Sequence, residues 1–307
     1  MLAETAMRLP LGAVSEYESW EFEEGEEIAP GRAVLKPIGG GNRYEVCLVW
    51  DESLFALAIA KVLRPDRTGD EKALLDLARE VEALETLAHP VLVRCFDSVL
   101  DGPRPHVLIE HLEGPSLRRL IRRDGAIGLE QLLPLAAHVA GALQYMANSG
   151  YVHLDVKPDN IVMGVPPRLI DLSIARTLER AARTEGPIGT DPYMAPEQCV
   201  GDPPGAGIGS ATDSWGLGAT LFHAVSGRKP FPRGSGDEGR ERFPQLEQEP
   251  RELPSTVPDP LRSLIFELLE RDPARRPSCG EAVERLEPLV AELPRKIRLT
   301  RSGPVGA

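Results

Sequence analysis

The fold of this chain is decided by one stretch near its middle, Tyr151-Val152-His153-Leu154-Asp155-Val156-Lys157-Pro158-Asp159-Asn160. A second stretch, Leu169-Ile170-Asp171-Leu172-Ser173, follows shortly after it. Asp155 supplies a carboxylate to orient a hydroxyl group, and Lys157 supplies a cation. Asn160 and Asp171 supply oxygen ligands of the kind that Mg²⁺ binds. Phosphoryl transfer requires these groups, because it depends on positioning and charge neutralisation more than on covalent chemistry.

The same residues also have an ordinary interpretation. Asp155, Lys157 and Asp159 would serve equally well as solvated loop charges, and the run Pro158-Asp159-Asn160 is typical of a turn. The rest of the chain must decide between the two interpretations.

The composition is that of a globular protein. The 307 residues are 42% hydrophobic, which is enough for a sizeable buried core. No apolar run approaches the length of a membrane-spanning helix, and Met1 to Gly12 lack the layout of a secretory signal. These features predict a cytoplasmic protein without membrane insertion.

The charge and the cysteines exclude further classes of protein. A formal net charge of −12 argues against a nucleic-acid-binding surface, which would need Lys and Arg on phosphates. The cysteines, Cys47, Cys95, Cys199 and Cys279, stand far apart without C-x-x-C spacing. This favours reduced thiols over a zinc site or a disulfide framework.

An acidic segment, residues 1–30, opens the chain, with its glutamates crowded between Glu16 and Glu27. It is either an interaction or autoregulatory arm or a solvated, partly disordered leader, and its composition favours the leader.

Residues 31–63 alternate in a β-like pattern around the turn Gly39-Gly40-Gly41-Asn42-Arg43, whose glycines would let backbone N–H groups approach phosphate. That signal is weak alone, because such a turn is more often just a hairpin. Residues 71–88 have helical periodicity, with Glu80 inside the apolar stripe. A buried glutamate needs a partner, and Lys61 is the nearest candidate, unless Lys61 guards a sheet edge and Glu80 is solvated.

Strand-like runs at Val91 to Val99 and His106 to Glu110 lead into a chain that becomes helical. Helices are predicted at Leu129 to Asn148, Ser214 to Val225, Leu261 to Glu270 and Glu281 to Leu293. A β-rich segment followed by an α-rich segment predicts an α+β fold of two lobes with a cleft between them. We expect a small lobe at 31–112, a helical lobe at 113–292 and a tail at 293–307.

Taken together, these motifs resemble eukaryotic-type serine/threonine protein kinases of the bacterial kind over residues 31–292. The matching motifs occur in family order: the glycine loop from Gly39 to Val46, Lys61, Glu80, the loop with Asp155, Lys157 and Asn160, Asp171, the segment Gly189 to Glu197, the helix beginning Asp213-Ser214-Trp215-Gly216, and Arg276. So many ordered matches make coincidence a poor explanation.

The resemblance implies a role for each matching residue. The loop Gly39, Gly40 and Gly41 would cover the phosphates of ATP, Lys61 would hold them with Glu80 as its partner, and Asn160 and Asp171 would bind Mg²⁺. Asp155 would orient the substrate hydroxyl with Lys157 near the γ-phosphate. The adenine pocket would comprise the hinge Glu110 to Leu112, Ile109 behind it, and Val46 and Val162 on either side of the ring. Lys157 and Thr190 imply serine or threonine of a protein substrate as the acceptor, and Glu197 is expected to pair with Arg276.

Four positions depart from the family pattern. Tyr44 replaces the third loop glycine and is expected to crowd the loop tip. Ile59 replaces a small residue and would tighten the adenine pocket. Ser173 replaces the glycine after Asp171-Leu172, and Leu154 replaces the arginine before Asp155. None of them removes a group that touches metal, phosphate or proton. An active kinase is therefore the leading hypothesis, and the alternatives are a pseudokinase acting as a nucleotide-binding scaffold and a small-molecule phosphotransferase of similar fold.

Overall fold

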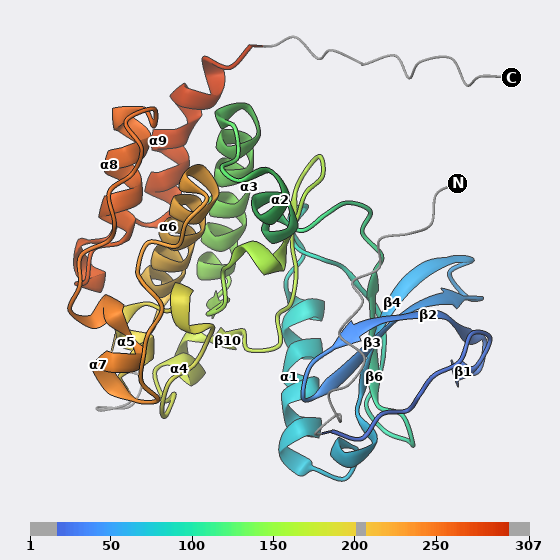
Figure 1. The fold of residues 1–307 in the computed structure, drawn as a ribbon. Coiled ribbons are helices and arrows are strands. Elements are labelled where there is room, and N and C mark those ends of the chain that lie inside the picture. Colours follow the sequence, from blue (N-terminus) through green and yellow to red (C-terminus); the bar gives the residue numbers. More distant parts are fainter. Residues whose placement is uncertain (1–16, 201–206, 295–307) are drawn as a thin grey trace, which may run out of the picture.

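The computed structural model describes residues 17–200 and 207–294, which form two lobes of different composition (Figure 1). The smaller lobe combines a sheet with helix α1, and the larger lobe is built mainly from helices α2 to α9. The predicted two-lobed α+β fold is therefore confirmed.

The sheet of the small lobe is antiparallel, with the strand order β1-β2-β3-β4-β6-β5. Its strands are β1 (Glu27–Ala29), β2 (Arg32–Gly40), β3 (Tyr44–Asp51), β4 (Ala56–Leu63), β5 (Cys95–Val99) and β6 (His106–Glu110). The strand predicted from Val91 begins only at Cys95. The reason is that Val91 and Val93 exchange backbone hydrogen bonds with Leu169 of the large lobe instead of pairing with β6.

Helix α1 (Glu71–Thr86) forms as its periodicity predicts. Asp70 caps its first turn, with the carboxylate accepting hydrogen bonds from the N–H groups of Lys72 and Ala73. The apolar stripe faces the core, and Glu80 lies on that buried face with 2% of its surface exposed. The alternative of a solvated Glu80 is therefore wrong.

The large lobe is organised around α6 (Ser210–Ser226), whose Trp215 and Phe222 are almost completely buried. The other helices are α2 (Leu117–Asp124), α3 (Leu129–Asn148), α4 (Leu178–Ala181), α5 (Pro196–Cys199), α7 (Gly239–Arg242), α8 (Asp259–Leu268) and α9 (Cys279–Ala291). Short strand pairs join β7 (Tyr151–Val152) to β10 (Arg176–Thr177) and β8 (Ile161–Val162) to β9 (Arg168–Leu169). Among the described helices, none has both the length and the apolar character that crossing a membrane requires.

The acidic N-terminal segment is packed over the part of it that the structure describes. Phe22 belongs to an apolar cluster on the sheet, and Trp20 packs against that cluster. The Trp20 indole N–H donates to the carbonyl of Leu63 at 2.7 Å, and the Trp20 amide donates to Glu45 at 2.8 Å. The small lobe thus begins before residue 31, because two aromatic side chains among the glutamates have apolar surface to bury. Residues 1–16 of the expected leader and 295–307 of the expected tail lie outside the described residues.

Candidate active site

The Asp155 carboxylate lies at the centre of a closed hydrogen-bonded ring. It accepts from the Lys157 ammonium at 2.5 Å and from the Thr190 hydroxyl at 2.7 Å. Lys157 also donates to the Thr190 oxygen at 2.7 Å, and the Asn160 amide donates to the Asp155 carboxylate at 3.2 Å. Asp155 is 9% exposed, whereas Asp159 is exposed. The interpretation as solvated loop charges is therefore wrong for Asp155 and Lys157.

Helix α6 fixes the loop that carries this ring. The buried Asp213 carboxylate accepts hydrogen bonds from the backbone N–H groups of His153 (2.7 Å) and Leu154 (2.9 Å). One turn along, a Cβ on Gly216 would lie 2.9 Å from the Cβ of Val156, so only glycine lets the loop approach the helix so closely. Leu154 is held at φ +66°, a conformation that a leucine rarely adopts. The loop is a positioned element because its neighbours determine its backbone.

A second charged group joins the two lobes. The Lys61 ammonium lies 2.5 Å from Glu80 on α1 and 3.0 Å from Asp171 of the large lobe. Burial lowers the pKa of Lys61, but Glu80 and Asp171 outweigh burial and raise that pKa above its usual value. Burial likewise raises the pKa of Asp171, but Lys61 and a hydrogen bond from Ser173 hold it well below its usual range. Lys61 is therefore cationic and Asp171 anionic, and the alternative of Lys61 as an edge-strand lysine is wrong.

Between the lobes lies a pocket of about 350 Å³ with mostly apolar walls and charged groups at one end. It is lined by Ile38, Val46, Ile59, Lys61, Val93, Ile109, Glu110, His111, Leu112, Asn160, Val162, Ile170 and Asp171. An apolar pocket with a few converging polar groups suits a nucleotide, whose base needs apolar contact and whose phosphates need charge.

Most residues that the sequence assigned to a nucleotide site line this pocket: Val46, Ile59, Lys61, Ile109, Glu110, His111, Leu112, Asn160, Val162 and Asp171. Glu80 is not on the wall but contacts Lys61. The three glycines do not line the pocket either. Gly39 pairs with Val46, Gly40 pairs with Glu45, and the Gly41 amide donates to the carbonyl of Tyr44 in the hairpin. Gly40 is required by the hairpin itself, because a Cβ there would lie 2.4 Å from that carbonyl.

Three lining residues carried no sequence argument: Ile38, Val93 and Ile170. Ile38 and Ile170 stand directly before Gly39 and Asp171, so an apolar residue next to each motif was the available signal. Val93 gave no such signal, since its place depends on its backbone hydrogen bond to Leu169 of the large lobe.

Tyr44 does not crowd the loop tip as expected. It is 7% exposed and belongs to the main core, and its ring centroid lies 5.0 Å from the Lys61 ammonium. A cation over an aromatic face is attracted to it. Tyr44 therefore acts on the lysine itself, whereas the turn is tied to α1 by an ion pair of 3.1 Å between Arg43 and Asp76.

Leu154, at the position of the usual arginine, joins an apolar cluster. Val152, Ala181 and Ile208 complete its buried part, with Ile174 and Ile188 packed against it. Three arginines of the following segment already have partners: Arg176 donates to the Thr184 hydroxyl, Arg180 pairs with Glu82, and Arg183 pairs with Glu179. Residues 171–197 are therefore held at this point by apolar packing around Leu154 together with these polar contacts, and Leu154 itself offers no charge that could bind a phosphate.

The metal question rests on Asn160 and Asp171. Both offer hard oxygen ligands, and Asp171 is anionic, which suits Mg²⁺. Within residues 17–200 and 207–294 no cluster of three or more His, Cys, Asp or Glu side chains could hold a metal ion. The two residues thus fit a cation that takes its remaining ligands from phosphate and water, which is how Mg²⁺ is usually bound beside nucleotides.

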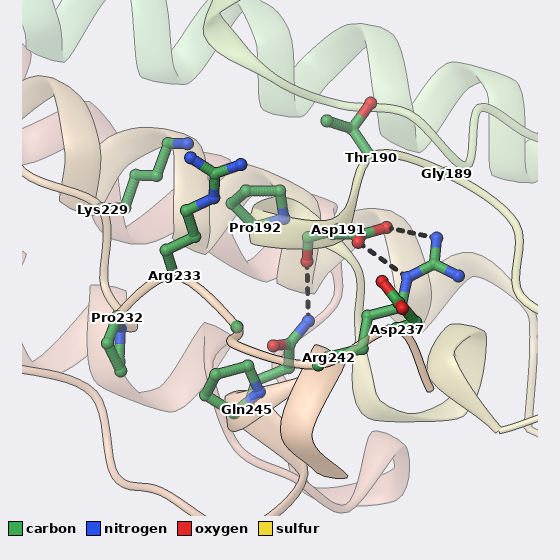
Figure 2. Close-up of a pocket in the computed structure, with 13 residues that line it drawn as sticks. Gly189, Thr190, Asp191, Pro192, Lys229, Pro232, Arg233, Asp237, Arg242 and Gln245 are labelled. Atoms are coloured by element: carbon green, nitrogen blue, oxygen red, sulfur yellow. Dashed lines mark hydrogen bonds and ion pairs between the residues drawn. The ribbon is translucent and has the colours of Figure 1, made fainter. Parts of the chain in front are cut away.

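A larger pocket, of about 720 Å³, opens beside Thr190 (Figure 2). On one side of it Asp191 is held by Arg242 through contacts of 2.8 and 3.0 Å, and Gln245 donates to the Asp191 carbonyl. Lys229 and Arg233 occupy the other side. Because Thr190 belongs both to this wall and to the Asp155 ring, the pocket adjoins the candidate catalytic carboxylate.

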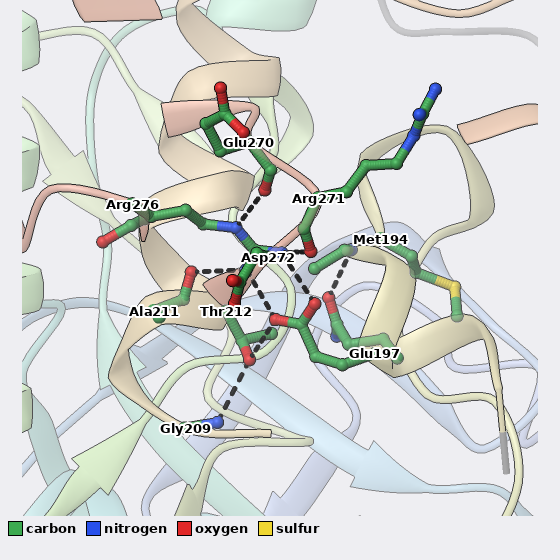
Figure 3. A network of polar contacts seen from close by, with 12 residues as sticks. Met194, Glu197, Gly209, Ala211, Thr212, Glu270, Arg271, Asp272 and Arg276 are labelled. Atoms are coloured by element: carbon green, nitrogen blue, oxygen red, sulfur yellow. Dashed lines mark hydrogen bonds and ion pairs between the residues drawn. The ribbon is translucent and has the colours of Figure 1, made fainter. Parts of the chain in front are cut away.

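The expected pair of Glu197 and Arg276 is present and buried (Figure 3). Two guanidinium nitrogens meet the two carboxylate oxygens at 2.6 and 2.8 Å, and the side chains are 0% and 5% exposed for Arg276 and Glu197. The guanidinium also donates to the carbonyls of Glu270, Ala211 and Arg271. The pair joins α5, at the end of the segment 171–197, to the turn before α9.

A family model described as "Protein kinase domain" matches residues 32–286. The chain belongs to the protein kinase family. It is 36% identical over 239 residues to the serine/threonine-protein kinase PkaA of Streptomyces coelicolor, a match covering 76% of this chain and 42% of that protein. It is 33% identical to the probable serine/threonine-protein kinase PkwA of Thermomonospora curvata, over 84% of this chain and 34% of that protein. A third relative, the serine/threonine-protein kinase PknB of Mycobacterium leprae, is 31% identical over 63% of this chain and 32% of its own length. The chain therefore spans less than half the length of these relatives.

Proposed function

We propose that the chain is a serine/threonine protein kinase that transfers the γ-phosphoryl group of ATP to hydroxyls of protein substrates with Mg²⁺ as the metal. The observation that carries the proposal is the position of the Asp155 ring next to a cleft where Lys61, Asn160 and Asp171 converge. The relatives' names, all serine/threonine-protein kinases, support the same activity.

The proposal assigns a role to each residue of the site. The apolar walls, with Val46 and Val162, would bind the base, and Lys61 would hold the phosphates while Glu80 and Asp171 keep it protonated. Asn160 and Asp171 would hold Mg²⁺, which when bound neutralises phosphate charge and fixes its orientation. Asp155 would orient the acceptor hydroxyl and take its proton, with Lys157 stabilising the charge nearby.

One observation favours a second candidate, a kinase-like scaffold that binds nucleotide without turnover. The ring centroid of Tyr44 lies 5.0 Å from the Lys61 ammonium and Ile59 lines the pocket, so both departures from the family pattern lie where ATP would bind. This candidate predicts nucleotide binding without transfer, whereas a small-molecule phosphotransferase would transfer phosphate without labelling protein. The cytoplasmic location stays a prediction.

The test is transfer from labelled ATP by the purified chain with Mg²⁺, with and without a generic protein acceptor. Asp155→Asn is the matched control, because it preserves the shape of the side chain and removes its charge. Label on protein that depends on Asp155 supports the kinase. Nucleotide binding in a thermal-shift assay without any transfer, or label found only on a small molecule, would select one of the alternatives.

A further inference from the structure

One side of the pocket beside Thr190 carries positive charge without a paired carboxylate. The charged ends of Lys229 and Arg233 lie next to one another, away from the paired Asp191 and Arg242 (Figure 2). Neither Lys229 nor Arg233 forms an ion pair with a carboxylate of the described residues. Two like charges that lie together without a counter-charge repel each other, so an anion placed there would relieve the repulsion.

A third cation, Arg118 of α2, does not line the pocket but lies close enough to Lys229 for its charge to act on that lysine. It donates to Nε2 of His223 at 3.3 Å, so that the other ring nitrogen carries the proton and donates to the Tyr193 hydroxyl at 2.7 Å. Burial, and then Arg118 and Lys229, lower the pKa of His223 to about 4. His223 is therefore neutral near pH 7 and orients Arg118 without compensating its charge.

The balance of charge around Lys229 points the same way. Burial lowers the pKa of Lys229, as do Arg118 and Arg233, and Asp159 is the single carboxylate that acts noticeably on it. The whole chain carries a net charge of −12, and most arginines within residues 17–200 and 207–294 are paired with a carboxylate, as Arg242 is with Asp191. Cations without a carboxylate partner, beside the proposed catalytic centre of an acidic protein whose arginines are mostly paired, therefore need an explanation.

We propose that Arg118, Lys229 and Arg233, hereafter the cationic cluster, bind an anionic side chain of the protein substrate, either a carboxylate or a phosphate, close to the acceptor residue. The inference rests on the proposed kinase function. Guanidinium and ammonium groups that are partly shielded from water bind carboxylates and phosphates through strong charge-assisted hydrogen bonds. A pocket of 720 Å³ is roughly 9 Å across, or about three extended residues, so the anion should lie within about that distance of the acceptor.

The experiment compares serine peptides in which Glu, phosphoserine, Ala or Lys occupies each of about three positions on either side of the acceptor. At one position or more, Glu or phosphoserine should raise kcat/KM about tenfold over Lys, as expected of a charge-assisted contact. The gain should come mainly through KM and should shrink between roughly 50 and 300 mM NaCl, because salt screens partly exposed charges. Whether Glu or phosphoserine gains more tells the two sources of the anion apart.

Charge reversal tests whether the cluster itself makes the choice. Lys229→Glu combined with Arg233→Glu should invert the preference toward Lys, and glutamine at all three positions of the cationic cluster should abolish it. Arg228→Gln is the matched control, since it removes an adjacent exposed cation that does not line the pocket, and it should retain the preference. Melting curves of all variants separate loss of preference from loss of fold.

The two proposals fail in different ways. Transfer to peptides or to a generic protein without any preference for an anion would overturn this inference alone, as would a preference that survives glutamine at all three positions of the cationic cluster. Absence of transfer to every peptide, to protein and to the chain itself would overturn the proposed function and this inference with it.

Discussion

Replacing Glu197 by alanine would leave the Arg276 guanidinium buried without its carboxylate. Removing one partner of a buried ion pair costs ~3–5 kcal/mol, because the remaining charge is stranded. Arg276 would keep its hydrogen bonds to the carbonyls of Glu270, Ala211 and Arg271. We therefore expect the lower end of that range, which corresponds to a fall of roughly 6–12 °C in Tm for a domain of this size.

Activity should fall with stability in this variant, because Glu197 and Gln198 lie on the same short helix. The Gln198 amide donates to the carbonyls of Leu154, beside Asp155, and of Ile188, each at 2.8 Å. A displaced α5 would therefore disturb the loop that positions the Asp155 carboxylate, to which we assign the catalytic role.

The assay is thermal unfolding followed by circular dichroism, with initial rates measured on the same samples. Glu267→Ala is the control, because Glu267 makes the same two-contact pair with Arg285, at 2.6 and 2.8 Å, but on the surface. Exposed pairs contribute only about 0–1 kcal/mol. A Glu197→Ala shift no larger than the Glu267→Ala shift would refute the reasoning, as would a Glu197→Leu/Arg276→Met double variant that loses as much as both single variants combined.

Three further predictions follow from other contacts. Asp171→Asn and Lys61→Ala should each lower the rate of transfer about 10²-fold or more, because each removes charge at the proposed phosphate site. Only Lys61→Ala should also lower Tm clearly, since it leaves the buried Glu80 without its partner, and equal melting curves for the two variants would contradict this. Phosphatase treatment should leave the initial rate within roughly tenfold of the rate before treatment, because Leu154 makes apolar contacts and cannot bind a phosphate. Mass spectrometry checks how far Thr177 and Thr184 are phosphorylated, and a larger drop in rate would show that phosphorylation is required. Burial raises the pKa of Asp51, but hydrogen bonds from Ser53 and Arg32 lower it to about 2. The ionised carboxylate therefore stabilises the fold above the unfolded-state pKa of about 3.9 and loses this effect as the pH falls toward 2. Asp51→Asn should flatten the loss of stability over that pH range, and parallel acid unfolding curves for the two proteins would contradict the prediction.

The sequence by itself determined those features that depend on local pattern and on charge balance. The period of α1 put Glu80 on the buried face, and the cost of an unpaired buried charge indicated Lys61 as its partner. The α3 helix ends at Asn148 as predicted, and α6 ends at Ser226, one residue beyond the predicted end; a glycine at positive φ follows within two residues of each end. The pairing of Glu197 with Arg276 came instead from the resemblance to the protein kinase family, because no local rule joins residues 79 positions apart.

Only the tertiary structure decided how distant segments share space. Tyr44 was expected at the loop tip, but the strand pairing that follows the hairpin turns it toward Lys61. Leu154 was recognisable as a missing arginine, yet its partners Ala181 and Ile208 come from separate segments. The residues of the cationic cluster likewise come from α2 and from the loop after α6. Which cations lack a carboxylate partner depends on the ion pairs formed in the rest of the fold. Periodicity and capping act along the chain, whereas side-chain direction and unpaired charge arise from packing between segments, and a linear pattern does not encode which surfaces will meet.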